Sequence, residues 1–509
     1  MKKINSFIKK HKYLLFCLLI SIIFLSFTSK NSFLYPLNDW VDANAFFTVG
    51  KGMMNNVLPY KDIFEQKGPL LYVVYGIGYL LSHKTFHGVF IIEIILFTIF
   101  LYYIHKLISL FLDRKVSFII LPILACLLTT STGFVHGGSC EELCLPLFAC
   151  SLYYYTKHFK EKELSYKELF INGILAGCIL LTKYTLLGFW FAFMMFIFFD
   201  LVIKKKYKQS ILSCIYFLLG MVSPIVIFLI YFLITNSLKE FIECYFTINI
   251  SAYNETVSIT ERLYTIFTNG LASIKNNGYP IFLLFISIPI LIFFLKIPKY
   301  YKISLLAVII ISMIGIFWGL KFYRYYVFPL HIFIILSIIA ICFILRRFID
   351  CLINNKFSLV IYSLIFIISL VCTYFNANYR EMIGMKKETM FQYKYADYIG
   401  KFENPTLLNM GYLDAGLYTT TGIIPNTKFF EVQNIPYENF PDNRDEMEKN
   451  VRNQDVMFIL YFTKSGDDVS NKDQYIYDYY DLVKKEYQSC EHDDYTALLF
   501  QVKNLTNKS

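Results

Sequence analysis

A polar segment of the chain, residues 38–71, carries many charged side chains directly after the first long apolar run. Its charged residues include Asp39, Asp42, Lys61, Asp62, Glu65 and Lys67. A carboxylate can take a proton from an attacking hydroxyl, and a nearby ammonium group can hold a phosphate leaving group. We therefore take this segment as the centre of a predicted active site, at a boundary between water and lipid.

Further polar residues lie between later apolar runs, where a charge beside lipid is costly and often functional. They are His136, Glu141, Glu142, Lys183, Lys321, Tyr323 and Arg324. A guanidinium group binds phosphate through two parallel hydrogen bonds, which suits Arg324, whereas a lysine acts as a point charge. The topology predicted below brings these loops to one face of a membrane.

Each candidate also has a purely structural interpretation. Asp42 could be the N-cap of a helix, and Lys67 could be an interfacial lysine whose stem lies along apolar surface. Glu141 and Glu142 stand at the start of an apolar run, where carboxylates favour the helix dipole. Arg324 lies among tyrosines and could anchor the chain at the membrane interface. The combination of acidic and basic residues on one predicted face favours a functional role.

The parts of the chain that must position these residues are membrane helices. Of the 509 residues, 56% are hydrophobic, and the mean hydropathy is +0.49, which excludes an ordinary soluble enzyme. Apolar runs of roughly 13–25 residues recur to about residue 372, and many are long enough to cross ~30 Å of hydrocarbon. The formal net charge of +10 would suggest nucleic acid in a soluble protein. Here the basic residues mark cytoplasmic loops, so no nucleic-acid partner is predicted.

We predict a multi-pass cell-membrane protein with about eleven spanning helices. The basic N-terminus places that end in the cytoplasm and residues 38–71 outside. A short amphipathic helix is expected over 45–54, and the apolar stretch 70–81 suits a helix lying in the outer interface. Lys183 is predicted at the outer tip of a helical hairpin. The predicted spans are 13–27, 89–112, 116–128, 143–155, 169–181, 186–203, 211–234, 280–295, 303–320, 326–345 and 357–374.

Near residue 376 the composition changes from apolar to polar, which predicts two domains. Residues 1–375 would form the transmembrane catalytic domain, including a first outer loop over 29–88, and residues 376–509 a soluble domain. Apolar strands alternating with helices indicate that the second domain is a small extracytoplasmic α/β domain. Its predicted parts are helices at 387–400 and 444–453, strands at 406–410, 456–462 and 495–502, and a polar helix between the last two strands.

Motifs for several other chemistries are absent from the sequence. It holds no Walker-type phosphate loop, no His-Glu-x-x-His metalloprotease motif, no Gly-x-Ser-x-Gly nucleophile elbow and no dinucleotide fingerprint between a strand and a helix. An ATP-driven pump and an enzyme with a cytosolic nucleotide-sugar domain are therefore not favoured.

The order of these parts over residues 1–324 resembles the GT-C glycosyltransferases, in particular the protein O-mannosyltransferases, the lipid A aminoarabinose transferases and bacterial cell-envelope members. The segment GMMNNVLPYKD, Gly52–Asp62, resembles a motif that follows the first-loop aspartate. The triplet Lys67-Gly68-Pro69 resembles the family's opening of a juxtamembrane helix. Gly137–Glu142 resembles the second acidic loop, and Gly173–Tyr184 resembles a glycine-rich span that ends in Leu-Thr-Lys.

This resemblance implies a membrane glycosyltransferase that moves a hexosyl or pentosyl group from a polyprenyl-phosphate donor. The acceptor would be a hydroxyl of a cell-envelope glycan, lipid or protein, with inversion at the anomeric carbon. Asp42 would be the general base, with Asp39 as the second candidate, and the donor phosphate would contact Lys67, Lys183 and Arg324. Substrate contacts would come from Tyr60, Asp62, His136, Glu141 and Glu142. The resemblance implies no certain cofactor; a divalent metal ion, if one binds, would be held by Asp42 and Glu141.

Two other functions remain open at this stage. A lipid-linked glycan flippase or transporter would need charges at mid-membrane and related halves, whereas the charges here lie at the predicted outer boundary and no internal repeat is found. A polysaccharide polymerase or ligase shares the many spans and a large outer loop. It would be expected to lack both the aspartate loop directly after the first span and the Lys-Gly-Pro helix.

Overall fold

The computed structural model describes residues 2–252, 257–276, 297–490 and 493–503, and the chain forms two compact units that each draw on three separate stretches. Unit 1 comprises Met1–Ser29, Ile92–Phe228 and Thr256–Arg380. Unit 2 comprises Lys30–Ile91, Leu229–Glu255 and Glu381–Ser509. The polar segment that follows the first apolar helix is thus in the same unit as the C-terminal residues. The predicted span 280–295 lies outside the described residues.

Apolar helices make up most of unit 1, and two of them, α4 and α10, extend into unit 2. Across the described ranges, seven helical stretches are long and apolar enough to cross a membrane, which confirms the predicted class of polytopic helical membrane protein. The described α-helices of this unit with nine or more residues, which include shorter ones than the spanning candidates, are α1 (Lys2–Thr28), α4 (His87–Ile108), α5 (Ser117–Thr129), α7 (Leu145–Lys160), α8 (Tyr166–Lys183), α9 (Gly188–Ile203), α10 (Tyr207–Ile234), α13 (Ile259–Lys275), α15 (Lys299–Ile316), α16 (Ile334–Ile344), α17 (Arg346–Asn354) and α18 (Ser358–Asn376).

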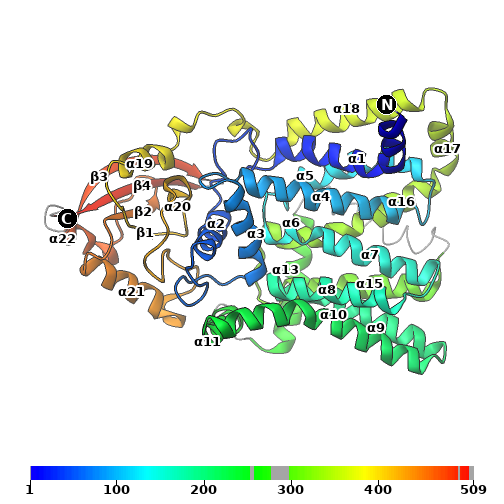
Figure 1. The fold of residues 1–509 in the computed structure, drawn as a ribbon, viewed down its shortest axis with the longest axis horizontal. Helices are drawn as coiled ribbons and strands as arrows, with labels where there is room; N and C mark the ends of the chain where they lie inside the picture. Colours follow the sequence, from blue (N-terminus) through cyan, green and yellow to red (C-terminus); the bar gives the residue numbers. More distant parts are fainter. Residues whose placement is uncertain (1, 253–256, 277–296, 491–492, 504–509) are drawn as a thin grey trace. The chain divides into compact units, whose positions relative to one another are not determined.

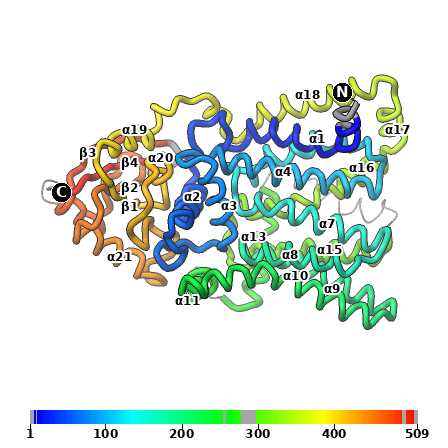
Figure 2. Tube along the Cα trace, in the orientation of Figure 1, coloured from blue at the N-terminus to red at the C-terminus, as the bar shows by residue number. Residues whose placement is uncertain are grey.

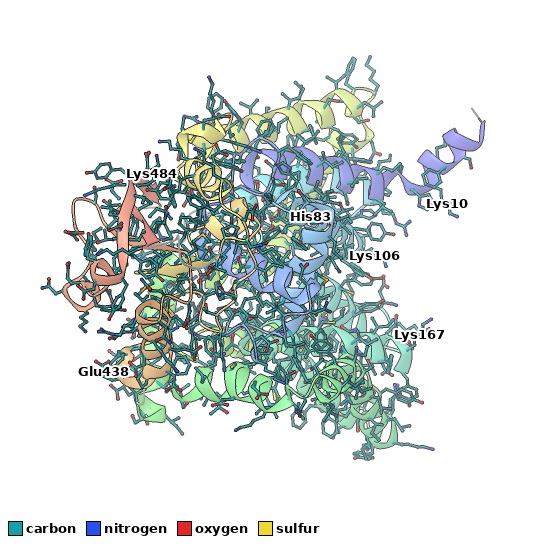
Figure 3. All side chains as sticks on the ribbon, turned by 60° about the vertical axis from the view of Figure 1, so that its left-hand side comes forward. Lys10, His83, Lys106, Lys167, Glu438 and Lys484 are labelled. Carbon is teal, nitrogen blue, oxygen red and sulfur yellow. The ribbon has the colours of Figure 1, made fainter. Side chains whose placement is uncertain are left out.

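The outward surfaces of these helices are apolar. On α18, Leu359 is 77% exposed and Ile368 is 60% exposed, and on α10, Ile227 is 68% exposed. A run of exposed aliphatic side chains along a helix is unfavourable in water and favourable against lipid tails. Three labelled lysines of this unit, Lys10, Lys106 and Lys167, lie along one edge of it in Figure 3.

One 38-residue apolar stretch, Tyr166–Ile203, holds two helices joined by a sharp turn. The turn begins at Lys183, whose backbone is extended (φ −155°, ψ 94°) between α8 and a short 3₁₀ segment, Tyr184–Leu187. The far end of α9 comes back to the loop before α8: Lys204 Nζ lies 3.4 Å from a Glu163 carboxylate oxygen, and Lys206 Nζ lies 2.7 Å from the other. These contacts agree with the predicted hairpin.

Glycines let α8 pack closely against α10. A Cβ atom placed on Gly173 would lie 2.0 Å from the Phe217 carbonyl oxygen, and one on Gly220 would lie 2.0 Å from the Phe170 carbonyl oxygen. Small residues permit such close contact between membrane helices, where packing rather than hydrophobic burial drives association. The glycine-rich sequence GILAGC therefore has a packing role.

Two helices organise the first stretch of unit 2, and they lie side by side in Figure 2: α2 (Val41–Met54) and α3 (Pro69–Leu81). They approach so closely that a Cβ atom on Gly50 would lie 2.6 Å from the Gly76 backbone nitrogen. With 13 residues, α3 is about 20 Å long, too short to cross the ~30 Å hydrocarbon core. It matches the predicted short helix over 70–81.

The long segment after α10, which lies between the predicted spans 211–234 and 280–295, is mostly helical where it is described. It contains α11 (Leu238–Ile242), a π-helical turn over Glu243–Thr247, α12 (Ile248–Ser251) and α13. Tyr60 packs against this segment: its ring centroid lies 5.5 Å from that of Phe241. The helical residues 238–251 therefore form part of the support of the first polar segment.

The C-terminal stretch forms a four-stranded mixed sheet with helices beside it (Figure 1). The strand order is β1-β2-β4-β3, with β1 parallel to β2 and the other neighbours antiparallel. This confirms the predicted small α/β domain. The strands are β1 (Leu407–Met410), β2 (Phe458–Lys464), β3 (Tyr480–Cys490) and β4 (Asp493–Val502), and the helices are α19 (Phe391–Ile399), α20 (Leu417–Thr421), α21 (Pro441–Arg452) and α22 (Ile476–Tyr479).

The prediction of a polar helix between the last two predicted strands is wrong. That region forms β3, an edge strand paired only with β4 among the described strands, preceded by the four-residue α22. Its sequence, YDLVKKEYQSC, is polar because edge strands are exposed and are protected by charge from pairing with other chains. Tyr487 is 68% exposed. The high polarity hid the strand pattern.

Candidate active site

The two candidate base residues lie at the start of α2 in unit 2. Asp39 is buried and forms an ion pair with Lys30, which is only 2% exposed. Trp40 is the N-cap of α2 and makes no side-chain cap bond, so the predicted N-cap role of Asp42 is wrong. Asp42 instead lies half-buried in the first turn of the helix, where the unpaired backbone N–H groups favour a negative charge.

Helix α2 is buried on its polar side as well as its apolar side, which corrects the amphipathic helix expected from sequence. Its polar residues are bonded by the C-terminal stretch of the same unit. The Thr419 hydroxyl donates to the Asn44 side-chain oxygen at 2.7 Å, and the Thr48 hydroxyl donates to Asp414 Oδ2 at 2.7 Å. Lys51 Nζ donates to the carbonyl oxygens of Tyr418 and Ile423. Asp42 therefore lies in the first turn of a helix whose polar side chains are held by hydrogen bonds.

Burial perturbs the charged groups around α2. It lowers the pKa of Lys51 from its ordinary value, an effect that the nearby Asp414 carboxylate opposes. It raises the pKa of Asp414, against hydrogen bonds from Thr48 and from the Gly416 backbone N–H. Burial raises the pKa of Glu431 well above its usual range, and the charges of Asp414, Glu65 and Asp42 add to that effect. Asp414 is thus linked through its charge to both Lys51 and Glu431.

Lys67 stands just before α3, on a turn whose backbone is held by buried side chains. The Tyr60 hydroxyl donates to the Lys67 carbonyl oxygen at 2.6 Å, and the Lys67 N–H donates to Glu65 Oε2 at 2.8 Å. Tyr72 also donates to that Glu65 oxygen. The Lys67 side chain is 27% exposed and its Nζ lies 3.9 Å from Glu65 Oε1. Lys67 thus presents an ammonium group on a fixed backbone.

Two other predicted substrate contacts belong to the same segment. Tyr60 is fully buried, has a positive φ of 71°, and its hydroxyl donates a hydrogen bond to the Lys67 carbonyl oxygen. Asp62 is exposed, and its Oδ2 accepts the Leu58 backbone N–H at 2.9 Å. In this structure both residues shape the turn between α2 and α3.

In unit 1, Lys183 and Glu141 form a buried ion pair. Glu141 is 1% exposed and Lys183 is 9% exposed, and the Lys183 Nζ lies 3.4 Å from the centroid of the Tyr326 ring. A cation at this distance is attracted to the face of an aromatic ring. The turn between α8 and α9 therefore places a lysine against the second acidic loop, as the sequence pattern indicated.

A second buried acid, Glu142, faces Glu93 of α4. The Gly138 N–H donates to Glu142 Oε2 at 2.7 Å, and the Ser29 hydroxyl donates to Glu93 Oε2 at 2.8 Å. Burial, followed by the adjacent Glu93 carboxyl, raises the pKa of Glu142 well above its usual range. Gly137 has a φ of +87°, and a Cβ atom there would meet the Ser29 hydroxyl oxygen at 2.1 Å. The Gly-Gly pair lets the loop turn against α1.

The remaining predicted residues of unit 1 differ in exposure. His136 is buried, and its ring stacks on Tyr379 with centroids 5.1 Å apart. Arg324 is exposed at the start of a 3₁₀ segment, Arg324–Phe333, two residues before Tyr326. The predicted residues thus form two sets. One lies in unit 1 (Glu141, Glu142, His136, Lys183, Arg324) and the other in unit 2 (Asp39, Asp42, Tyr60, Asp62, Lys67).

Several residues around the unit 2 set were missed by sequence reasoning. Lys30 lies two residues after the end of α1, a place where a lysine usually contacts lipid headgroups or water, so nothing marked it as a buried ion-pair partner. Glu431 and Gln433 lie in the run FFEVQN, which has no recognisable motif. Asp414 belongs to a Gly-Tyr-Leu-Asp-Ala-Gly turn, and the turn was a local signal that pointed to its position.

Metal ligation is not indicated by geometry within the described part of the chain, where no group of three or more His, Cys, Asp or Glu side chains is placed to hold an ion. Of the two residues predicted to hold a metal ion if one binds, Glu141 is already paired with the Lys183 ammonium group. Asp42 lies in the other unit.

Comparison with known proteins gives a family match over part of the chain. Residues 66–240 match the family of dolichyl-phosphate-mannose-protein mannosyltransferases, about a third of the sequence. The matched segment includes Lys67, Glu141, Glu142 and Lys183 and excludes the two candidate base residues. No curated protein resembles the chain closely enough in sequence to count as a match.

The fold is similar to that of ArnT from Cupriavidus metallidurans. The crystal structure of that protein bound to undecaprenyl phosphate aligns with a TM-score of 0.56 at 11% identity, covering 96% of this chain and 97% of ArnT. Its apo structure aligns with a TM-score of 0.48 at 12% identity, covering 97% and 98%. The predicted resemblance to the GT-C glycosyltransferases is confirmed by the family match and by the first of these alignments.

Proposed function

We propose that this protein is a membrane glycosyltransferase that moves a sugar from a polyprenyl-phosphate donor to a hydroxyl of a cell-envelope acceptor. The observation that carries the proposal is the match of residues 66–240 to a family whose named donor is dolichyl-phosphate-mannose. The ArnT fold over nearly the whole chain supports it, because the ArnT crystal holds undecaprenyl phosphate. The acceptor would be a glycan, a lipid or a protein, reached on the extracytoplasmic face, with the N-terminus in the cytoplasm.

Asp42 is the better candidate for the general base. Asp39 is committed to a buried ion pair with Lys30, whereas Asp42 is half-buried at the start of a fixed helix. In the proposed step the acceptor hydroxyl gives its proton to the Asp42 carboxylate while its oxygen attacks the anomeric carbon. The bond from that carbon to the phosphate oxygen breaks on the opposite face. Polyprenyl phosphate leaves, and the configuration is inverted.

The phosphate needs positive charge as the bond breaks. Lys67 can supply a point charge from a held backbone, and the exposed Arg324 can supply a bidentate guanidinium contact. Lys183 is paired with Glu141, so its role would be to bind phosphate while Glu141 keeps it in place. Glu142, and His136 six positions before it, would orient the sugar or acceptor. Tyr60 and Asp62 would act through the turn they hold.

The test is transfer by the purified full chain in lipid nanodiscs, with tritium-labelled sugars supplied either on undecaprenyl phosphate or on a nucleoside diphosphate. We expect label to reach a membrane acceptor from the polyprenyl-phosphate donor, with release of one polyprenyl phosphate per sugar moved. Transfer from the nucleotide donor alone would contradict the proposal. Transfer from neither donor, together with movement of a lipid-linked glycan across the bilayer, would favour the flippase.

A further inference from the structure

A chain of buried side chains joins the sheet domain to the turn that carries Lys67, within unit 2. The Gln66 side-chain amide donates to Gln433 Oε1 at 3.1 Å, and the Gln433 amide donates to Glu431 Oε1 at 3.0 Å. The other Glu431 oxygen accepts the Asp414 backbone N–H at 2.6 Å. Gln66, Gln433, Glu431 and Asp414 are 6%, 3%, 1% and 0% exposed. Buried hydrogen bonds of this kind fix geometry, because an unpaired amide there would be costly.

Backbone and ring contacts join the same two regions next to this chain. The Phe64 N–H donates to the Lys428 carbonyl oxygen at 2.9 Å. The Phe64 ring centroid lies 5.2 Å from that of Phe429 and 5.1 Å from that of Phe440. The C-terminal residues therefore contact this turn through main chain, apolar rings and polar side chains together.

The turn is also held from its other side. The Asn249 amide donates to the Gln66 carbonyl oxygen at 2.8 Å, and the Tyr60 hydroxyl donates to the Lys67 carbonyl oxygen. The backbone from Phe64 to Lys67 is thus fixed from several directions, while the Lys67 side chain remains 27% exposed. An accessible ammonium group on a fixed backbone is pre-organised to contact an anion. The backbone loses little conformational freedom when the anion binds.

We propose that Gln433, oriented by Glu431, is a positioning residue for Lys67, so that the C-terminal domain forms part of the donor-phosphate site. The proposal rests on the proposed function, in which Lys67 contacts the polyprenyl phosphate. Gln433 does not touch substrate in this account. It holds Gln66 in place, and the position of Gln66 sets the direction in which the Lys67 side chain leaves the backbone.

The test compares the full-length variants Gln433→Ala, Gln66→Ala and their double variant. Two quantities are measured: hydrogen exchange of the peptide spanning residues 61–72, and the KM and kcat for an undecaprenyl-phosphate sugar. We expect each single variant to raise exchange of this peptide and to raise KM roughly fivefold, the effect of one lost hydrogen bond, with kcat changed less than twofold. The double variant should show no larger change in exchange or KM than either single variant, because both substitutions remove the same hydrogen bond between Gln66 and Gln433.

Two further variants control for general damage. Gln433→Glu keeps the oxygen that accepts from Gln66 but replaces the donor to Glu431 with a second carboxyl group, so its KM should rise as in Gln433→Ala. Gln488→Ala, on β3 of the same domain, should change neither quantity. Thermal unfolding of each variant identifies one that does not fold.

The outcomes separate this inference from the proposed function. Unchanged exchange in the 61–72 peptide of Gln433→Ala would overturn the positioning role, whatever the activity. Raised exchange with unchanged donor KM would show that the link does not serve the phosphate site and would also overturn the inference. Wild-type protein that neither binds undecaprenyl phosphate nor transfers sugar would refute the proposed function. In that case the exchange result still decides whether Gln433 positions the Lys67 turn, and the donor-site part of the inference fails with the function.

Discussion

At the scale of single residues, the structure separates two aspartates that the sequence presents as near equals. Asp39 balances the charge of a buried lysine, while Asp42 lies half-buried in the first turn of α2. The distinction comes from Lys30, a residue nine positions before Asp39 that no motif marks. The spacing of the two carboxylates makes them look alike, because the buried ion pair between Asp39 and Lys30 cannot be read from the sequence.

Asp39→Asn should lower the stability of the folded protein more than it lowers the rate of sugar transfer. The change leaves the Lys30 ammonium group buried without its carboxylate, and breaking a buried ion pair in this way costs about 3 kcal/mol or more. We expect a lower thermal unfolding midpoint and poor yield of the purified variant. The double variant Lys30→Met with Asp39→Asn removes both charges and should recover much of the midpoint. A wild-type midpoint in the single variant would show that the pair is not needed.

Asp414 should make the stability of the protein depend on pH in the acid range. Its pKa is raised by burial from 3.8 to about 6, so the folded state holds this proton more tightly than the unfolded state does. The stabilisation is complete below about pH 3.8 and is lost as the pH rises to about 6. The Thr48 hydroxyl donates to this carboxyl, and the charges of Lys51 and Glu431 interact with it.

The check is Asp414→Asn, since the Thr48 hydroxyl can rotate to accept from the new amide. We expect the fall in unfolding midpoint between pH 4 and pH 6 to be smaller in the variant than in wild type. Lys51 has a lowered pKa, so it acts in the opposite direction and at higher pH, and the difference between the two proteins isolates Asp414. Identical pH profiles would contradict a raised pKa at Asp414.

At the scale of helices and strands, the sequence predicts well where the signal is local. Gly68-Pro69 places the start of α3, because proline fits the first turn of a helix and needs no backbone partner there. The hairpin of α8 and α9 follows from two apolar runs around Thr-Lys-Tyr-Thr. By contrast, β3 was missed because an exposed edge strand is as polar as a surface helix.

Close packing of α8 against α10 should make Gly173 intolerant of a side chain. Gly173→Val would place atoms well inside contact distance of the Phe217 carbonyl oxygen, so the helices must separate. We expect loss of folded protein by size-exclusion chromatography in detergent, whereas Ile174→Val, the next residue on the same helix, should behave as wild type. A monodisperse Gly173→Val protein with an unchanged unfolding midpoint would contradict this packing.

At the scale of the whole molecule, the two compact units do not follow the order of the chain. The first polar segment and the C-terminal residues share unit 2, and α2 is buried because Asp414 and Thr419 bond its polar side. Those partners lie more than 360 positions away in sequence. No local pattern could show that the polar face of α2 would be covered, so the sequence predicted only a short amphipathic helix.

Removing residues 381–509 should therefore disable the first polar segment as well as the sheet. Asn44, Thr48 and Lys51 would lose their partners, and buried polar groups without partners are costly. We expect the truncated protein to insert in membranes but to show protease cleavage within residues 38–71, where the full-length protein resists it. Equal protection of that segment in both proteins would contradict a shared fold.

The central claim is that Asp42 is the base in transfer from a polyprenyl-phosphate sugar. The most direct measurement is the rate of that transfer by Asp42→Asn and by wild type, at matched membrane levels and matched unfolding midpoints. Asparagine keeps the shape of the side chain but cannot accept the acceptor's proton, so we predict a loss of roughly 10²–10⁴-fold in kcat with little change in donor KM. Full transfer by a folded Asp42→Asn protein would contradict the account.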